Sequence, residues 1–482
     1  MPMQSSTKQN DLIEQRSWTP QYHFYKPNHW INDPNGLFFL NGTYHLFFQL
    51  NPDDVVWGNM HWGHATSDDL INWQHQPIAL YAEPEGLGYI FSGGAIVDKN
   101  NTSGFAKNGE TPIVATFTQQ SKDETQVQSI AYSLDEGKSF TVYDQNPVIP
   151  NPGLKDFRDP KVTWYEKGQF WIKTVVAGQC IHIYKSNDLK TWHKLSEFGH
   201  KIGAHGGVWE CPDLFPLICS DTDTERWVLI ISINPGGPNG GSATQYFIGD
   251  FDGEKFVSQD EQIRWLDYGT DCYAGITWDN TPNIKHSRTY IAWMSNWQYA
   301  NNTPDNTWRG AMTLLRTMYL KKAEQSYYLL TPSAVKLPQD TVRLQYCLSK
   351  EQPISVPEAY SLECDISLTQ GNIALVWKND CNEQFRLEID ADTQSVTADR
   401  TKAGFTDKGF DSVIKMPLSK HECTNLQLEI FVDECSIELF FNNGAHCITA
   451  LVFPKQAFSQ LHIDQSSKKE SLENLKITKY TK

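Results

Sequence analysis

The sequence between residues 22 and about 330 is divided into short apolar runs by glycine, proline, asparagine and aspartate. Examples of these runs are residues 43–48, 113–117, 227–231 and 289–294. Almost none of them repeats its apolar residues at the 3.6-residue period of a helix. Short runs rich in β-branched and aromatic residues, bounded by turn formers, are typical of β-strands. The sequence therefore predicts an all-β domain over this region.

A turn motif recurs within this region. Residues 67–73 (Ser-Asp-Asp-Leu-Ile-Asn-Trp) resemble residues 186–192 (Ser-Asn-Asp-Leu-Lys-Thr-Trp), and looser copies begin at positions 133 and 249. The four starting points are 66, 53 and 63 residues apart. Such a repeat is a little longer than the ~40–50 residues of a four-stranded propeller blade, which indicates blades with long loops. At roughly 60 residues per repeat, the region predicts a five-bladed β-propeller.

Beyond about residue 353, apolar and polar residues alternate with a period of two. The alternating segments are residues 374–377, 385–389, 426–432 and 436–441, and Asn442-Asn443-Gly444 adds a hairpin turn. This pattern predicts a C-terminal β-sandwich. We therefore divide the chain into a frayed N-terminus (1–20), a propeller (21–335), a linker (336–352) and a sandwich (353–482).

Charge and composition exclude several classes of partner. The net charge is −16 and there is no long basic run, so no attraction to nucleic acid is expected. No stretch approaches the ~20 apolar residues of a membrane span. The first ten residues lack the apolar segment of a secretory leader. We expect a cytoplasmic chain, or a secreted one whose leader has been removed. The ten cysteines show no metal-binding spacing, and neither a metal nor another cofactor is expected.

A second repeat places polar residues at a common phase. Its positions are Asp33, Ser92, Asp159, Glu210 and Asp271, which are 59, 67, 51 and 61 residues apart. The spacing between these positions is similar to the spacing between the copies of the turn motif, but the positions themselves fall elsewhere in each repeat. One such position per blade can lie at the mouth of the central channel of a propeller, where residues distant in sequence converge. The period therefore predicts one shared pocket.

Three converging carboxylates restrict the chemistry of such a pocket. Two are enough to cleave a glycosidic bond, one ionised and one protonated so that it can donate to the leaving oxygen. Glu210, beside Trp209, is expected to lie in a drier site that favours the protonated form. Asp33 and Asp159 are expected to stay ionised, Asp159 because the cation of Arg158 is adjacent.

Each of these groups also has a purely structural interpretation. Residues 32–36 (Asn-Asp-Pro-Asn-Gly) are typical of a surface turn. Residues 158–159 can form a structural ion pair, and Glu210 can form a salt bridge at a rim. His61 and His64 offer only weak spacing for a metal, and we assign them to the wall of the pocket. The common period favours the functional interpretation.

Six motifs stand in a fixed order along the chain. They are His29-Trp30-Ile31-Asn32-Asp33-Pro34-Asn35-Gly36, Phe48-Gln49-Leu50-Asn51-Pro52, Trp57-Gly58, Phe91-Ser92-Gly93, Arg158-Asp159-Pro160 and Glu210-Cys211. Together they resemble the motif set of glycoside hydrolase family 32, which comprises invertases, sucrose-6-phosphate hydrolases and fructan hydrolases. The resemblance extends from about residue 20 to the C-terminus. As a set the motifs are highly specific, although Arg-Asp-Pro or Glu-Cys alone would carry almost no information.

The resemblance implies a five-bladed propeller followed by a β-sandwich, and a retaining mechanism. It implies that Asp33 is the nucleophile, Glu210 the acid/base and Asp159 the transition-state stabiliser. The fructose pocket that it implies is lined by Asn32, Gln49, Trp57, Phe91, Ser92, Arg158, Tyr273 and Trp297. Two positions depart from the family's usual pattern: Ile31 replaces a methionine, and Cys272 replaces a phenylalanine, which loosens a wall of the pocket.

The resemblance also implies an exo-acting β-fructofuranosidase that releases terminal fructosyl units from sucrose or fructans by double displacement. Residues 293–304 are more similar to levan and inulin hydrolases and yeast-type invertases than to the phosphosucrose enzymes. A sucrose-6-phosphate hydrolase is the nearest alternative, although no cluster of lysine and arginine marks a phosphate pocket. An inverting propeller glycosidase of the arabinan or xylan type and a non-catalytic fructan-binding protein are further alternatives. We expect a carbohydrate partner and a monomer or homodimer.

Overall fold

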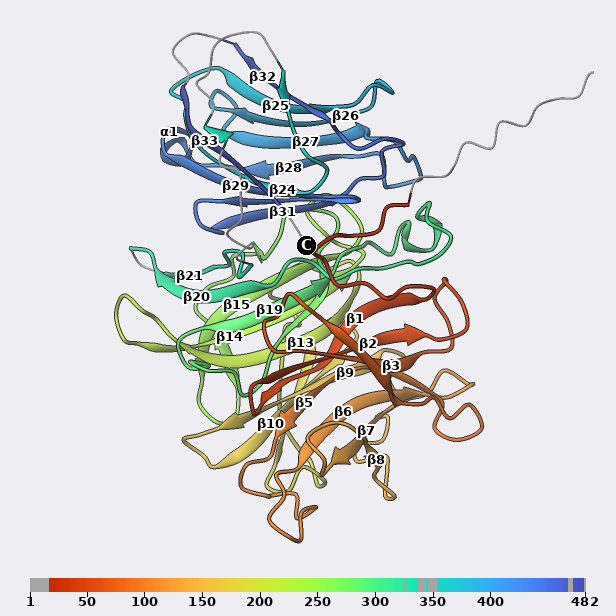
Figure 1. Ribbon diagram of the computed structural model, residues 1–482. Helices are drawn as coiled ribbons and strands as arrows, with labels where there is room; N and C mark the ends of the chain where they lie inside the picture. Colours follow the sequence, from red (N-terminus) through yellow and green to blue (C-terminus); the bar gives the residue numbers. More distant parts are fainter. Residues whose placement is uncertain (1–16, 325, 336–343, 346–352, 467–470, 481–482) are drawn as a thin grey trace, which may run out of the picture.

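The computed structural model describes residues 17–324, 326–335, 344–345, 353–466 and 471–480 (Figure 1). Within these residues the elements are almost all strands, so the all-β prediction is confirmed. The exceptions are the 3₁₀ helix η1 (Ala300–Asn302) and the helix α1 (Lys420–Thr424). Neither of these helices combines the length and the apolar character that crossing a membrane would require.

Five antiparallel sheets follow one another along the first two thirds of the chain, each built from consecutive strands. Blade 1 contains β1 (Trp30–Leu40), β2 (Thr43–Asn51), β3 (His61–Ser67) and β4 (Gln74–Leu80). Blade 2 contains β5 (Tyr89–Val97), β6 (Ile113–Gln120), β7 (Gln126–Ser133) and β8 (Thr141–Val142). Blade 3 contains β9 (Phe157–Tyr165), β10 (Phe170–Ala177), β11 (Ile181–Ser186) and β12 (His193–Phe198).

The fourth and fifth sheets complete the set. Blade 4 contains β13 (Val208–Ile218), β14 (Glu225–Asn234), β15 (Ala243–Phe251) and β16 (Phe256–Ser258), and β17 (Arg264–Trp265) also pairs with β15. Blade 5 contains β18 (Tyr273–Thr277), β19 (Arg288–Trp293), β20 (Arg316–Lys322) and β21 (Tyr327–Leu330).

The first strands of the five blades close into a ring. β1 lies against β5, β5 against β9, β9 against β13, β13 against β18, and β18 against β1. Backbone hydrogen bonds join the ends of the ring, because the amide of Phe39 donates to Asp279 (3.0 Å) and that of Asp279 donates to Leu37 (2.9 Å). The five-bladed propeller that the repeat predicted is confirmed. Residues that lie at the same height on these five strands therefore face one central channel.

The repeated turn motif joins the third and fourth strands of blades 1 to 4. In blade 1 the carboxylate of Asp69 accepts from the amides of Ile71 (2.8 Å) and Asn72 (2.7 Å), and in blade 3 Asp188 binds Lys190 and Thr191 in the same way. Leu70 and Leu189 have φ values of 67° and 62°. Such φ values are unfavourable for leucine, so the hydrogen bonds of the aspartate stabilise the turn.

The C-terminal strands form two six-stranded sheets, which confirms the predicted sandwich (blue in Figure 1). One sheet contains β22 (Leu344–Gln345), β33 (Ser471–Lys479), β24 (Tyr360–Ser367), β29 (Leu426–Asp433), β30 (Ser436–Phe441) and β31 (His446–Leu451). The other contains β23 (Ile354–Ser355), β32 (Gln460–Gln465), β25 (Asn372–Lys378), β26 (Gln384–Asp390), β27 (Ser395–Lys402) and β28 (Val413–Pro417). Buried residues that alternate along both sheets form the sandwich core, where the indole of Trp377 donates to the hydroxyl of Tyr360 (2.6 Å).

The structure departs from the expected domain division in two segments, the N-terminus and the linker. Trp18 lies in the segment expected to be frayed, yet it is buried against Phe453 and donates to the carbonyl of Pro454 (2.9 Å). Residues 1–16 of that segment lie outside the described residues. In the expected linker, β22 pairs with β33 and so belongs to the sandwich, and the rest of residues 336–352 lies outside the described residues.

A network of fully buried charges joins the propeller to the sandwich. One guanidinium nitrogen of Arg316, on β20, donates to Asp267 (2.7 Å) and to Glu438 on β30 (3.2 Å). The ring of His23 contacts Asp433 through Nδ1 (2.7 Å) and Glu438 through Nε2 (2.9 Å). Buried charges are tolerated only when they are paired and hydrogen-bonded. The network therefore fixes how the two domains meet.

Asp271 belongs to this interface and not to the predicted pocket. Its carboxylate accepts from the guanidinium of Arg400 on β27 (2.7 Å) and from the hydroxyl of Tyr299 (2.6 Å). Asp271 lies two residues before β18, so its side chain is placed outside the ring of inner strands. The prediction that it lines the pocket is wrong, because the step of the repeat does not fix the phase to within two residues.

We expect the stability of the interface to depend on the protonation of His23. Burial lowers the pKa of His23, but the contacts with Asp433 and Glu438 outweigh burial and raise it from 6.5 to about 9. This rise corresponds to roughly 3 kcal/mol, which is present below about pH 6.5 and is lost as the pH rises through 9. His23→Gln should therefore lower the thermal unfolding temperature markedly at pH 6 and less at pH 9.5.

The matched control is His421→Gln, because His421 is exposed on α1. It should leave the unfolding temperature unchanged at both pH values. A His23→Gln deficit that is the same at pH 6 and pH 9.5 would contradict the role assigned to the charged imidazole.

Candidate active site

Each of the five inner strands has an irregularity near its beginning. The register of pairing shifts between Ile31 and Pro34 on β1, and at residues 90–93 on β5, 158–161 on β9, 210–213 on β13 and 273–276 on β18. A β-bulge bends a strand and re-aims its side chains, and bulges are frequent next to active sites. The bulges lie at the same height around the channel, so they bring together the residues that they carry.

Residues at the bulges of β1, β5, β9 and β13 line a pocket with a volume of about 380 Å³. Of the residues predicted from the sequence, those that line it are Asn32, Asp33, Gln49, Trp57, Phe91, Ser92, Arg158, Asp159, Glu210 and Trp297. Tyr273 is fully buried behind the wall, where its hydroxyl contacts the carboxylate of Glu210. Four of the five positions of the repeat, Asp33, Ser92, Asp159 and Glu210, thus meet at one end of the channel, although the outer two are 177 residues apart.

Asp33 is held by hydrogen bonds from both sides. The hydroxyl of Ser92 donates to Oδ2 (2.6 Å) and the amide of Asn32 donates to Oδ1 (3.0 Å), while the indole of Trp30 fixes the orientation of that amide (2.8 Å). Burial raises the pKa of Asp33, the negative charge of Glu210 raises it further, and the two hydrogen bonds offset part of the rise. The turn-forming residues around Asp33 in the sequence do not reveal this burial.

Asp159 is the most perturbed carboxyl of the pocket. Burial raises its pKa to about 7, and the positive charge of Arg158 lowers it by less. Contrary to the expectation from the sequence, Arg158 therefore does not hold the pKa of Asp159 at or below its usual value. The reason is geometric, because the guanidinium lies 2.7 Å from both Glu210 and Asp156 but 4.0 Å from Asp159. Asp159 also has a φ of 62° and is anchored by the amide of Cys211, which donates to its Oδ2 (3.0 Å).

Glu210 does not lie in the dry site expected for it. Its side chain is 18 % exposed, accepts from Arg158 (2.7 Å) and contacts the hydroxyl of Tyr273. Its neighbour Trp209 is fully buried in the blade, where the indole donates to Ala204 (2.9 Å). Successive side chains of a strand point to opposite faces, so Trp209 does not shield Glu210. Hydrogen-bond partners, and not an apolar wall, define the surroundings of this carboxyl.

Comparison with known proteins shows the family of this chain. The family model for the glycosyl hydrolases family 32 N-terminal domain matches residues 23–332, and the model for the family 32 C-terminal domain matches residues 334–479. The chain belongs to glycosyl hydrolase family 32. It is therefore a glycoside hydrolase, as the motif set predicted.

Three proteins illustrate how similar its family 32 relatives are. A levanase of Bacillus subtilis is 41 % identical over 464 residues, which cover 92 % of this chain and 68 % of the levanase. The crystal structure of an exo-inulinase from Aspergillus awamori has a TM-score of 0.87 and 35 % identity, and the match covers 97 % of this chain and 99 % of that one. A β-fructofuranosidase from Schwanniomyces occidentalis complexed with fructosyl-erythritol has a TM-score of 0.87 and 32 % identity, with 96 % and 97 % covered.

The family 32 motifs did not point to every residue that lines the pocket. The additional residues are Gln120, Glu124, Gln126, Lys155 and Asp156. They come from blade 2 and from the loop before β9, outside the six motifs, and only the position of Asp156 two residues before Arg158 hinted at its role. The spacing of the motifs along the sequence does not show that these residues of blade 2 and of the loop before β9 reach the pocket.

The two histidines that were assigned to the pocket wall lie elsewhere. His64 is buried in blade 1, where its Nε2 lies 3.1 Å from Nδ1 of His45, and burial lowers its pKa to about 3. The Nδ1 of His61 contacts the carbonyl of Asn59 (2.7 Å). Neither histidine lines the pocket, so their assignment to its wall is wrong. They contribute to blade 1 of this family 32 propeller.

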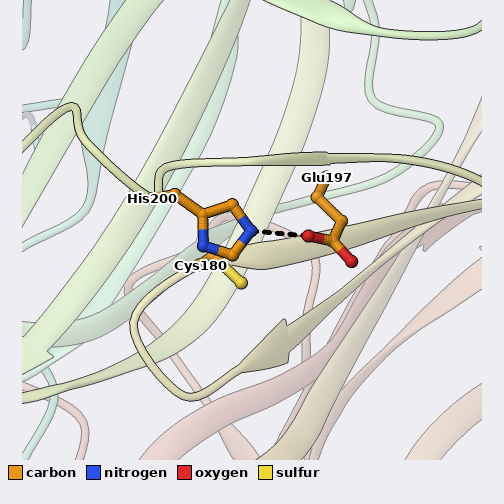
Figure 2. Close-up of side chains that lie close together, drawn as sticks. All are labelled: Cys180, Glu197 and His200. Carbon is orange, nitrogen blue, oxygen red and sulfur yellow. Dashed lines mark hydrogen bonds and ion pairs between the residues drawn. The ribbon is translucent and has the colours of Figure 1, made fainter.

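A possible cation cluster lies on blade 3, where Cys180, Glu197 and His200 are close together (Figure 2). The carboxylate of Glu197 is already paired with His200 (2.5 Å) and with the ammonium of Lys194 (2.5 Å). The thiol of Cys180 donates to the carbonyl of Ala177 (3.2 Å), and burial raises its pKa to about 11. A neighbouring ammonium and a protonated thiol both oppose a cation, and we assign no metal to this cluster.

Because burial raises the pKa of Asp159 from 3.8 to about 7, removing this carboxyl should stabilise the protein. The native state retains a proton that the unfolded chain releases, so stability falls as the pH rises between about 4 and 7. The rise corresponds to roughly 4 kcal/mol at most. Asp159→Asn should raise the unfolding temperature at pH 8 by several degrees and much less at pH 4, while activity falls.

The exposed Asp144 provides the control, since Asp144→Asn should change neither quantity. An Asp159→Asn variant that is less stable than the unaltered enzyme at pH 8 would show instead that the carboxylate has a stabilising structural role.

Proposed function

We propose that this chain is a retaining, exo-acting β-fructofuranosidase that hydrolyses terminal β-D-fructofuranosyl units of sucrose and fructans. The observation that carries the proposal is the convergence of Asp33, Asp159 and Glu210 in one pocket at the mouth of the channel. The similar proteins support it, because they are named levanase, exo-inulinase and β-fructofuranosidase, and the last was solved with fructosyl-erythritol.

In the first step of the proposed reaction, the carboxylate of Asp33 attacks the anomeric carbon C2 of the fructosyl unit. The bond from C2 to the leaving oxygen breaks while Glu210 donates its proton to that oxygen. The hydrogen bonds from Ser92 and Asn32 orient the carboxylate of Asp33 and favour its ionised form. The contact with Tyr273 holds the carboxyl of Glu210 toward the pocket.

In the second step, Glu210 acts as a base. It takes a proton from water, the oxygen of the water attacks C2, and the bond between C2 and Asp33 breaks to release fructose. Asp159 shares the pocket with the two other carboxyls and is held there by the amide of Cys211, with the guanidinium of Arg158 4.0 Å away. We assign it to hydrogen bonds with fructose hydroxyls and to the stabilisation of the positive charge that develops on the ring.

The shape of the pocket supports exo action. Its volume of about 380 Å³ suits a terminal sugar with part of the next unit, and not the middle of a polymer. Three aromatic side chains form one wall, with ring centroids 6.2 Å apart between Trp57 and Phe91 and 6.3 Å apart between Trp57 and Trp297. Trp57 is 42 % exposed and lies where a second sugar could stack on it.

A second candidate substrate, sucrose 6-phosphate, follows from Lys155. This exposed lysine lines the pocket, and it is the kind of single cation that the sequence motifs would not reveal. Initial rates on sucrose, sucrose 6-phosphate, inulin and levan distinguish the candidates. If kcat/KM for sucrose 6-phosphate exceeds that for sucrose and falls in Lys155→Ala, the second candidate is correct.

We further propose that residues 21–335 are the catalytic unit and that the sandwich braces it. The buried charge network between Arg316 and Glu438 supports a bracing role, since it ties β20 to the sandwich. A monomer or homodimer suits this arrangement, because the residues proposed to react all come from one chain.

Asp33→Asn should nearly abolish sucrose hydrolysis while leaving the fold intact. The amide cannot act as a nucleophile, so kcat should fall on the order of a thousandfold or more. Circular dichroism and thermal unfolding report the fold. Asp68→Asn, an exposed aspartate in a turn of blade 1, is the control and should retain full activity. Substantial activity in Asp33→Asn refutes the assignment of the nucleophile.

The stereochemistry of the first product tests the retaining mechanism. Two carboxyl groups about 5–5.5 Å apart favour double displacement, whereas inverting enzymes keep theirs about 6.5–9.5 Å apart. We expect the shorter separation for Asp33 and Glu210, so proton and carbon NMR during the first minutes of sucrose hydrolysis should show β-fructofuranose before mutarotation. An initial α-anomer would instead assign the chain to an inverting mechanism of the arabinan or xylan type.

A further inference from the structure

A second pocket of about 450 Å³ lies at the other end of the central channel. It is lined by Val97 at the end of β5, by Trp164 near the end of β9 and by Ile218 at the end of β13. The residues proposed to react lie at the beginnings of the same strands. The two pockets are separated by five to eight strand residues, or about 15–25 Å.

The channel between the two pockets is filled. The ammonium of Lys161 donates to the carbonyl of Thr277 (2.8 Å) and lies 4.0 Å from Asp213. The carboxylate of Asp213 accepts from the amide and the hydroxyl of Thr277, both at 2.8 Å. This buried polar layer separates the two pockets, so a ligand of one is not part of the site of the other.

Arg288 is the unusual residue of the second pocket. It is only 7 % exposed, its Nε is buried without a hydrogen-bond partner, and within the described residues its guanidinium forms no ion pair. The guanidinium lies over the ring of Phe215, with 4.7 Å from Cζ to the centroid. Burial lowers its pKa, and the more distant charges of Asp213 and Asp279 offset this only in part. A buried guanidinium without an anion is unfavourable, which points to a missing partner.

The acidic groups around this pocket, by contrast, already have partners. Glu166 accepts from the indole of Trp164 (2.9 Å), Glu225 is paired with Lys167 (2.9 Å), and Asp279 accepts from the amide of Val97 (3.1 Å). Lys99 and Lys285 add further positive charge to the lining. The unsatisfied hydrogen-bonding capacity of the pocket is therefore that of a cation, and it can bind an anion in a bidentate manner.

We propose that this pocket binds a small organic anion, with Arg288 as the anchor of its charged head group. A phosphate or a carboxylate fits the planar fork of the guanidinium equally well. The apolar walls, among them Trp164, Ile218 and Ile284, favour a compact or ring-shaped body behind the head group. The site is distinct from the pocket of the proposed hydrolysis and does not depend on it.

Isothermal titration calorimetry on the full chain tests the proposal with three probes of similar size. Phenyl phosphate and benzoate carry the two head groups, and benzyl alcohol is the neutral control. We expect one molecule of at least one anion to bind per chain, at least tenfold more tightly than benzyl alcohol. The anion that binds better identifies the head group. Saturating fructose, which would occupy the first pocket, should not displace it.

Two variants assign the binding to this pocket. Arg288→Gln should weaken anion binding at least tenfold while leaving the rate of sucrose hydrolysis within twofold. Without ligand, this variant should unfold at the same temperature as the unaltered protein or a higher one, because it removes an unpaired buried charge. Ile284→Trp, which fills the pocket and keeps the arginine, should weaken binding as well.

Three outcomes overturn the proposal. They are the failure of both anions to bind, unchanged binding in both variants, and displacement of the anion by fructose, which would place it at Arg158. The assay of sucrose hydrolysis is independent of these measurements, so failure here and failure of the proposed hydrolase function are distinguishable.

Discussion

The guanidinium of Arg158 is the positive charge on which the arrangement of the first pocket depends. It lies 2.7 Å from Asp156 and from Glu210, and 4.0 Å from Asp159. Three carboxyls that face one small cavity repel one another, and burial opposes their ionisation. Because Arg158 contacts Glu210 closely and Asp159 only from a distance, it fixes the position of the Glu210 carboxylate. It does not offset the effect of burial on the pKa of Asp159. The acids therefore retain different environments, which a reaction with one nucleophile and one proton donor requires.

The positions of these side chains depend on the rigidity of the strands on which they lie. The bulges at the beginnings of the inner strands place the side chains that we propose to react, and the ring closes through the backbone bonds of Asp279 with Phe39 and Leu37. The sandwich adds a second constraint, because the buried network around Arg316 and Glu438 holds blade 5 from outside. A bulge is unfavourable in an isolated strand, and here neighbours on both sides support it.

The sequence predicted what depends on repetition and missed what depends on burial. The spacing of the turn motif at residues 67–73 and its copies indicated the number of blades. In blades 1, 3 and 4 the aspartate of the motif accepts from the backbone amides two and three residues on, so a local pattern of hydrogen bonds recurs with the repeat. The pKa of Asp159 could not be predicted from its neighbour, because adjacency along a strand does not determine which carboxylate Arg158 contacts. Asp271 obeyed the period yet lies at the domain interface, since a shift of two residues decides whether a side chain enters the channel.

A propeller of this kind can offer a site at each end of its channel. Five parallel inner strands begin at one mouth of the channel and end at the other, so each mouth gathers side chains from several blades, and the second pocket takes its lining from blades 2 to 5. At the first mouth acidic groups outnumber basic ones around Arg158. At the second, the guanidinium of Arg288 forms no ion pair within the residues that the structure describes, and its Nε has no hydrogen-bond partner. The paired layer of Lys161 and Asp213 separates these opposite charge patterns. A ligand can therefore bind at either mouth without contacting the residues of the other mouth.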